Sequence, residues 1–171
     1  KKAQSTDVLE DVERELEGGA LTGPAAPEKR YGFLSVCAGE GIAAVFRDLG
    51  VDGIVSGGQT MNPSTESILK EIERTPAEVV FVLPNNKNII MAAQQCVGMT
   101  EKQVVVVPTT TIPQGITAMM NVELEAEPEE ILSAMTEAIE HVSTAQITYA
   151  ARDSDFDGSV IHAGDYLALL G

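Results

Sequence analysis

Four short apolar runs, separated by helical segments, are the feature that most constrains the fold of this chain. The runs cover residues 33–37, 53–55, 78–83 and 103–107, and each is followed by a loop rich in Gly, Asn or Thr. They are apolar throughout rather than alternating, which is typical of parallel strands covered on both faces. Strand, loop and helix in repeated order predict an open, mainly parallel α/β sheet of about four βα units over residues 31–122. Right-handed crossovers would bring all four polar loops to one edge of that sheet.

The segments on either side of this sheet have a different character. Residues 1–30 predict a short helix over 6–17 and a Gly/Pro/Ala linker, and the charged start without Met indicates a piece of a longer protein. Residues 123–171 predict a helix over 128–143 and then a small β-rich, hairpin-like extension, with strands at 146–150, 159–162 and 166–170 and a turn at 153–158. This last part belongs to the same domain or to the next one.

Composition excludes several classes of partner. The net charge of −15 disfavours nucleic acid and anionic membrane surfaces. No apolar run approaches the roughly 20 residues of a membrane span. Two cysteines without a CxxC pair fit a reducing, cytoplasmic setting. Aromatic residues make up only 4% of the chain, so the core is expected to be aliphatic.

The loop at residues 56–64 is the first candidate site. Two glycines permit close backbone approach and a helix follows, with Asn62 as its expected N-cap and Pro63 at its first position. This pattern suits an oxyanion or phosphate cradle, and it suits a plain strand-to-helix turn equally well. Ligands of open α/β sheets bind at the edge where such loops meet, so all four loops are candidates for ligand binding or docking. The candidate residues are Gly39, Glu40, Gly41, Ser56, Gly57, Gly58, Gln59, Thr60, Asn62, Asn85, Asn86, Asn88, Thr109 and Thr110.

No catalytic residue can be assigned. The chain has no GxxxxGK[ST] phosphate loop, and the acids around Asp155 do not have the spacing of a calcium loop. His141 and His162 are expected to be structural or exposed. Cys37 is a weak candidate for a metal ligand, since a small buried strand residue is the commoner role of such a cysteine.

The amino-acid sequences of the loops resemble those of a known family. The strings CAGEGI (37–42), SGGQTMNPST (56–65), LPNNKNIIMAA (83–93) and VVPTTTIPQGITAM (106–119) are similar to the middle region of the dihydroxyacetone-kinase-related proteins. The strings ITYAARDSDFDG (147–158) and IHAGDYLALL (161–170) resemble the stretch that follows. These proteins are the ATP-using subunits of bacterial fatty acid kinase, and the resemblance covers residues 31–171.

The resemblance implies a function for a longer protein. An N-terminal kinase domain would bind ATP and Mg²⁺ outside this chain, and it would phosphorylate a fatty acid held by a separate DegV-like carrier. This chain would be the middle, non-catalytic domain, with a fold related to DegV and dihydroxyacetone kinase, and with no cofactor of its own. Its expected partners are the carrier, the upstream kinase domain, the downstream C-terminal domain and a second copy of itself. Its expected roles are dimerisation, docking or substrate presentation.

Two other roles remain open. The chain could bind a small ligand in its own right (dihydroxyacetone, an acyl group or phosphate), or its loops could be merely turns of a scaffold. Some family members bind zinc through a Cys at the position of Cys37 and a His-x-His on the third strand. Residues 79–82 read Val-Val-Phe-Val, so we expect no zinc here.

Overall fold

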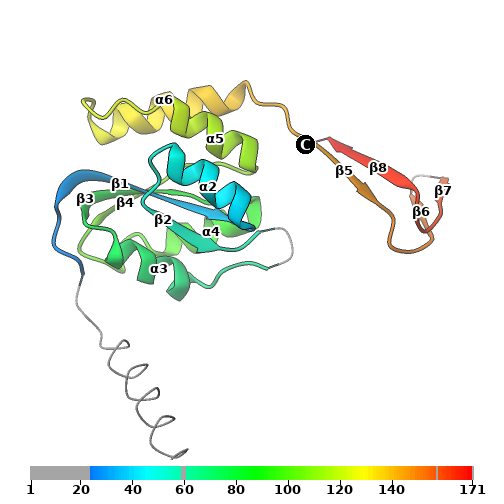
Figure 1. Ribbon diagram of the computed structural model, residues 1–171, viewed down its shortest axis with the longest axis horizontal. Coiled ribbons are helices and arrows are strands. Elements are labelled where there is room, and N and C mark those ends of the chain that lie inside the picture. Colours follow the sequence, from blue (N-terminus) through cyan, green and yellow to red (C-terminus); the bar gives the residue numbers. More distant parts are fainter. Residues whose placement is uncertain (1–23, 59–60, 157, 171) are drawn as a thin grey trace, which may run out of the picture.

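A four-stranded parallel sheet forms the centre of the protein. We describe a computed structural model, which covers residues 24–58, 61–156 and 158–170. The sheet has the order β2-β1-β3-β4, and every neighbouring pair is parallel (Figure 1). The α/β prediction is therefore confirmed, and all four strands end at one edge. The strands are β1 (Lys29–Cys37), β2 (Gly53–Ser56), β3 (Ala77–Leu83) and β4 (Gln103–Val106).

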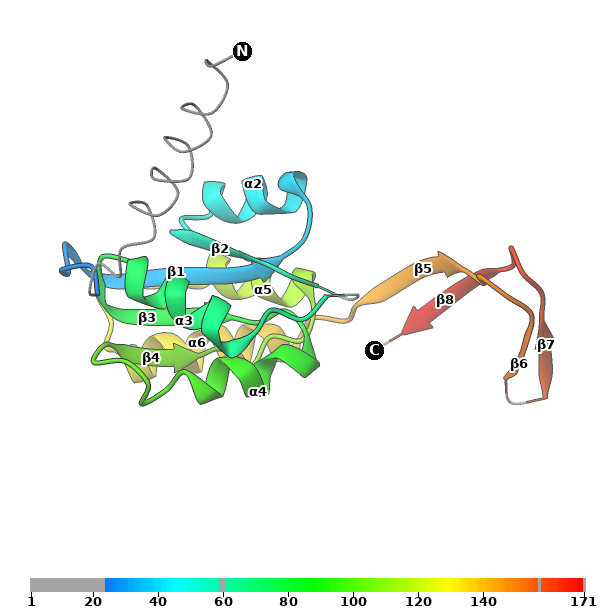
Figure 2. The ribbon, with the colours of Figure 1, turned by 90° about the horizontal axis from the view of Figure 1, so that it is seen from below.

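Helices cover both faces of this sheet. Figures 1 and 2 show α2, α5 and α6 on one face and α3 and α4 on the other. Because successive strand residues point to opposite faces, Phe33 packs with the first group of helices and Leu34 with the second. The helices are α2 (Glu40–Asp48), α3 (Thr65–Arg74), α4 (Lys87–Gln95), α5 (Ile112–Met120) and α6 (Pro128–Glu140).

The two layers of core differ in composition. The core under α3 and α4 is aliphatic, as predicted. On the other face the prediction of an aliphatic core is wrong, because Phe33 stacks on Phe81 with ring centroids 5.3 Å apart and Tyr31 meets Phe81 edge-on at 5.9 Å. Phe46 of α2 is fully buried in the same cluster. Few aromatic residues are present, but most of them gather in one place.

Two details of the helices depart from the predictions. The N-cap of α3 is Ser64, whose Oγ accepts a hydrogen bond from the Ser67 backbone N–H at 3.1 Å, so the assignment of Asn62 as cap and Pro63 as first residue is wrong. Ser64 lies two residues closer to the buried face of α3, and its hydroxyl bonds a backbone N–H of the first turn that has no partner within the helix. For α4, the four-residue spacing of Ile89, Ala93 and Val97 predicts a buried face, but the C-cap Cys96 is fully buried and Val97 is 53% exposed.

The last part of the chain forms an arm beside the α/β body. After α6, strand β5 (Ala145–Tyr149) pairs antiparallel with β8 (Tyr166–Leu170), and β6 (Ser154–Phe156) pairs with β7 (Ser159–Ile161) at the far end. The predicted turn at 153–158 is thus partly wrong, since it contains β6 and turns only after it. Figure 2 shows the arm projecting away from the sheet.

Two further predictions, a helix near the N-terminus and the absence of a membrane span, can be compared only with the residues that the structure describes. The helix expected over 6–17 lies outside them. Within the part that the structure describes, no helix has the length and hydropathy needed to cross a membrane.

Candidate functional site

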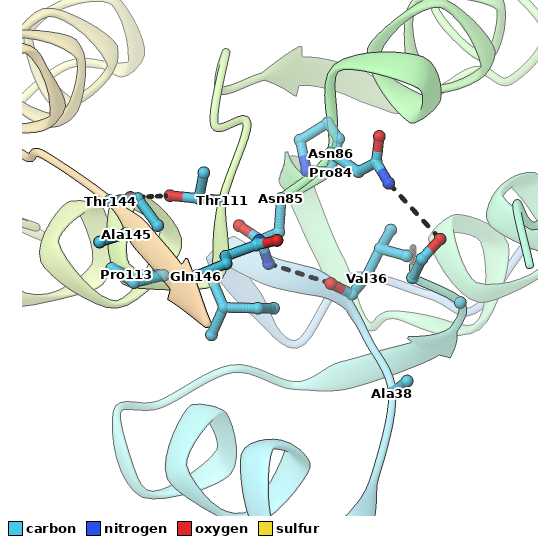
Figure 3. Close-up of a pocket in the computed structure, with 13 residues that line it drawn as sticks. Val36, Ala38, Pro84, Asn85, Asn86, Thr111, Pro113, Thr144, Ala145 and Gln146 are labelled. Carbon is cyan, nitrogen blue, oxygen red and sulfur yellow. Dashed lines mark hydrogen bonds between the residues drawn. The ribbon is translucent and has the colours of Figure 1, made fainter. Parts of the chain in front are cut away.

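A pocket of about 310 Å³ opens where the strands end (Figure 3). It lies between the loops that follow β1, β2 and β3, the start of α5 and the start of β5, so the arm contributes one of its walls. Its lining residues are Val36, Ala38, Gly57, Gly58, Pro84, Asn85, Asn86, Thr111, Ile112, Pro113, Thr144, Ala145 and Gln146. The carboxyl edge of the sheet is therefore hollowed, as the topology predicts for a site of this fold class.

Asn85 ties the strand ends together beneath this pocket. It is the only non-glycine residue of the described chain with a positive φ, at 55°, a conformation that Asn tolerates better than most residues. Its Nδ2 donates to Ser35 Oγ at 2.9 Å and to the Val36 carbonyl at 3.0 Å. Its backbone N–H donates to Thr109 Oγ1 at 3.0 Å. This one buried residue, just after β3, thus bonds to β1 through its side chain and to the loop after β4 through its backbone N–H.

The carbonyl oxygen of the same amide faces α5. Asn85 Oδ1 is buried and accepts no hydrogen bond from any described residue. A Cβ placed on Gly115 would lie 2.1 Å from this oxygen and 3.0 Å from Cζ of Phe46. Only glycine lets α5 approach the amide this closely, so Gly115 and Asn85 form one packing unit.

The glycines after β2 have already used their backbone donors. Gly57 N–H donates to the Cys37 carbonyl at 3.1 Å, and Gly58 N–H donates to the Met61 carbonyl at 2.9 Å. A Cβ on Gly57 would meet Pro63 Cδ at 2.6 Å, so close packing accounts for this glycine. These contacts favour the turn interpretation of the loop over the anion cradle.

Asn86 holds the next loop in place. Its Oδ1 accepts from the Asn88 N–H at 2.9 Å and so caps α4, while its Nδ2 donates to the Gly58 carbonyl at 3.4 Å. Figure 3 shows this second bond joining two walls of the pocket. None of the lining residues carries a charge, although charged residues make up 22% of the chain. The pocket therefore suits an uncharged group better than a phosphate or a carboxylate.

Comparison with known proteins identifies the family. The family of FakA-like C-terminal domains, named after a fatty acid kinase component, matches residues 32–171. The chain belongs to this family. Protein YloV of Bacillus subtilis is 43% identical over 140 residues, which are 82% of this chain and 25% of YloV.

Staphylococcal relatives give the same result. An uncharacterized protein of Staphylococcus epidermidis is 43% identical over 137 residues (80% of this chain, 25% of the relative), and one of Staphylococcus aureus USA300 is 41% identical over 138 residues (81% and 25%). This member of the FakA-like family thus spans about a quarter of the length of these relatives. The predicted middle position, carrier and dimer stay predictions, because the family match speaks only of a C-terminal part.

The candidate residues of this family member fall into three groups. Gly57, Gly58, Asn85 and Asn86 line the pocket. The Thr109 Oγ1 accepts a hydrogen bond from the Asn85 backbone N–H at 3.0 Å, and the Thr110 Oγ1 donates to the Gln114 Oε1 at 2.8 Å. Outside the lining are Gly39, Glu40, Gly41, Ser56, Asn62 and Asn88, while Gln59 and Thr60 lie outside the described residues.

Sequence reasoning missed the wall that the arm supplies. Thr144 and Gln146 line the pocket, and the Oγ1 atoms of Thr111 and Thr144 are 2.8 Å apart. Residues 144–146 follow a helix on the far side of the acidic joint in sequence, so only the path of α6 back to the sheet edge brings them here. No local pattern signals that return.

Cys37, the weak candidate for a metal ligand, is buried in the core that α2 covers. Burial raises the pKa of its thiol above the ordinary 9.0, which opposes the thiolate that binds metals. The described residues contain no group of three or more His, Cys, Asp or Glu side chains placed to hold a metal ion. The absence of zinc nevertheless stays a prediction for this chain.

We expect both cysteines to resist alkylation in the folded protein. Cys37 and Cys96 are buried and burial raises the pKa of each thiol, so iodoacetamide at pH 8 should label neither until urea unfolds the chain. Mass spectrometry of the labelled protein measures this. Rapid native labelling of Cys37 would contradict its burial and reopen its role as a ligand.

Proposed function

We propose that this chain is a non-catalytic domain of a fatty acid kinase subunit. The observation that carries the proposal is the family match over residues 32–171. In this proposal a kinase domain elsewhere in the same polypeptide binds ATP and Mg²⁺, and a DegV-like protein carries the fatty acid in the cytoplasm. The uncharged pocket supports a non-catalytic role, because phosphoryl transfer depends on acids that hold Mg²⁺ and on cations that hold phosphates.

The hollowed carboxyl edge of the sheet is the surface that we assign to docking. It gathers four loops and the base of the arm, which gives a surface of irregular shape built on rigid strands. Its polar groups are mainly amides and hydroxyls, which suit protein–protein hydrogen bonds. In this role the edge would receive the carrier and present its fatty acid to the kinase domain, and a homodimer would present two such edges.

A matched pair of substitutions tests the docking surface. Gln146→Arg places a charge in the pocket, and Gln103→Arg places the same charge at the opposite edge, at the start of β4. We expect Gln146→Arg to weaken carrier binding about tenfold or more in calorimetric titrations, because a buried, unpaired charge opposes docking. Gln103→Arg should leave the affinity within about twofold.

Three outcomes would contradict the proposal. Equal losses from both substitutions would remove the pocket edge from the docking surface. No affinity of the wild-type chain for the carrier would remove docking altogether. ATP-dependent phosphorylation of the carried fatty acid by the 171-residue chain alone would show that the domain is catalytic.

A small-ligand site is the second candidate, and the pocket itself favours it. Its volume of about 310 Å³ lies at the lower end of the range for small-molecule sites. The uncharged lining suits dihydroxyacetone or an acyl group better than phosphate. Saturable shifts of the Asn85 and Gln146 amide resonances with either ligand, in the absence of the carrier, would favour this candidate over docking.

A further inference from the structure

One face of the β5–β8 hairpin is apolar along its whole length. In this antiparallel ladder, residues directly opposite each other lie on the same face. The pairs on the apolar face are Ala145–Leu170, Ile147–Ala168 and Tyr149–Tyr166. All six side chains are exposed, with Ile147 at 80%, Tyr166 at 84% and Leu170 at 85%.

The other face of the same hairpin provides the comparison. There Gln146, which lines the pocket at the base of the arm, is opposite Leu169, and Thr148 is opposite Leu167, so polar and apolar residues alternate between the strands. The two faces thus differ as the inner and outer faces of an antiparallel sheet do. The apolar face, which has the composition of an inner face, is nevertheless exposed to solvent.

A two-stranded sheet with one apolar face needs another segment packed on that face to be stable. Isolated two-stranded hairpins are marginally stable in water, and a third strand or a packed helix is needed to hold them. Figures 1 and 2 show the arm extending away from the helices of the α/β body, and no described residue covers its apolar face. The cover therefore comes from outside the described residues.

We propose that a further segment of the same polypeptide covers this face, so that β5 and β8 are the inner strands of a larger packed unit. The inference uses the part of the proposed function that makes this chain one portion of a longer protein. The relatives support it, because the stretch that matches this chain is only 25% of their length. The covering segment presents an apolar strand or helix face of its own.

A second copy of the chain fits this face less well. A standard interface between proteins uses about 20–30 residues a side, whereas this face offers six. A tethered segment needs far less contact area, because the covalent link gives it a high effective concentration. The small size of the face therefore favours a cover from the same polypeptide.

Hydrogen exchange in the full-length protein and in the 171-residue chain tests the proposal. We expect the amides of β5 and β8 to exchange at least about tenfold more slowly in the full-length protein, at every protein concentration. Equal exchange in the two proteins would overturn the proposal. Protection that appears in the 171-residue chain and grows with concentration would overturn it in favour of a second copy.

Two neighbouring substitutions on β5 provide the control. Ile147→Lys places a charge on the apolar face, and Thr148→Lys places the same charge on the opposite face of the same strand. In the full-length protein we expect Ile147→Lys to lower the unfolding midpoint of the segment that contains β5, and Thr148→Lys to leave it unchanged. In the 171-residue chain, neither substitution should change the unfolding midpoint of this segment. Equal effects of both in the full-length protein would overturn the assignment of the inner face.

These results separate the inference from the proposed function. Carrier binding is measured at the pocket edge, and exchange is measured on the arm. Loss of carrier binding with intact protection of β5 would disprove docking and leave the covered face standing. Intact carrier binding without protection of β5 would disprove the covered face and leave docking standing.

Discussion

Replacing Gly115 by Ala is expected to destabilise the protein by about 3 kcal/mol, the upper range for overpacking a core. The added Cβ would lie 2.1 Å from Asn85 Oδ1, 2.8 Å from its Cγ and 3.0 Å from Phe46 Cζ. The amide cannot move aside easily, because its nitrogen is bonded to Ser35 and Val36 on β1. Either α5 must move outward or the amide must give up those bonds. Urea unfolding followed by circular dichroism measures the change in the free energy of unfolding.

Gly41→Ala is the matched control, since Gly41 is also a helical glycine. A Cβ there would meet nothing within 4 Å, and the substitution removes backbone freedom from the unfolded chain. We expect no loss of stability, and a gain of up to about 1 kcal/mol. If Gly115→Ala proved as harmless as Gly41→Ala, the close approach of α5 to Asn85 would be contradicted.

The second large effect is expected at Asn85 itself. Asn85→Gly keeps the positive φ but removes both bonds from Nδ2, and it leaves the buried Ser35 hydroxyl and Val36 carbonyl without that donor. We expect a loss of about 2 kcal/mol, the usual range for orphaning buried polar groups. Asn85→Ala should cost about 1 kcal/mol more, because alanine resists the left-handed conformation.

The two sites should not act independently. In an Asn85→Gly background the oxygen that obstructs a Cβ on Gly115 is gone, and only the 3.0 Å approach to Phe46 remains. Gly115→Ala should then cost at least about 1 kcal/mol less than it does in the wild type. Strictly additive losses in the free energy of unfolding would mean that α5 and the Asn85 amide are not in tight steric contact.

The sequence predicts the sheet because its strands are encoded locally. The run of valines at 104–107 and the run at 79–83 are apolar on both faces, and only a central or doubly covered strand buries such a segment. Gly50, with a φ of 94°, ends α2 as expected of a glycine after the last apolar residue. These features depend on neighbours in sequence, so reading the chain in order recovers them.

The site is predicted less completely because it depends on distant neighbours. The sequence predicts Asn85 and Asn86 as candidates because they follow a strand in a polar loop. Their roles, however, depend on Ser35, Gly58 and Thr109, which the fold brings next to them. The wall formed by residues 144–146 requires α6 to return to the sheet edge. Nor does aromatic content reveal that Phe33 and Phe81 stack, since that pair depends on β1 lying beside β3.

The strand order has a consequence for how the chain folds as it is synthesised. The first strand to emerge, β1, lies inside the sheet, and its longest pairing is with β3, from Lys29 opposite Ala77 to Ser35 opposite Leu83. A nascent chain therefore cannot form the central pair until two helices and another strand have left the ribosome. Until then the apolar residues of β1 have only β2 and α2 to cover them. Pairings between residues so far apart in sequence form slowly, so early folding of this domain depends on what protects its first strand during that wait.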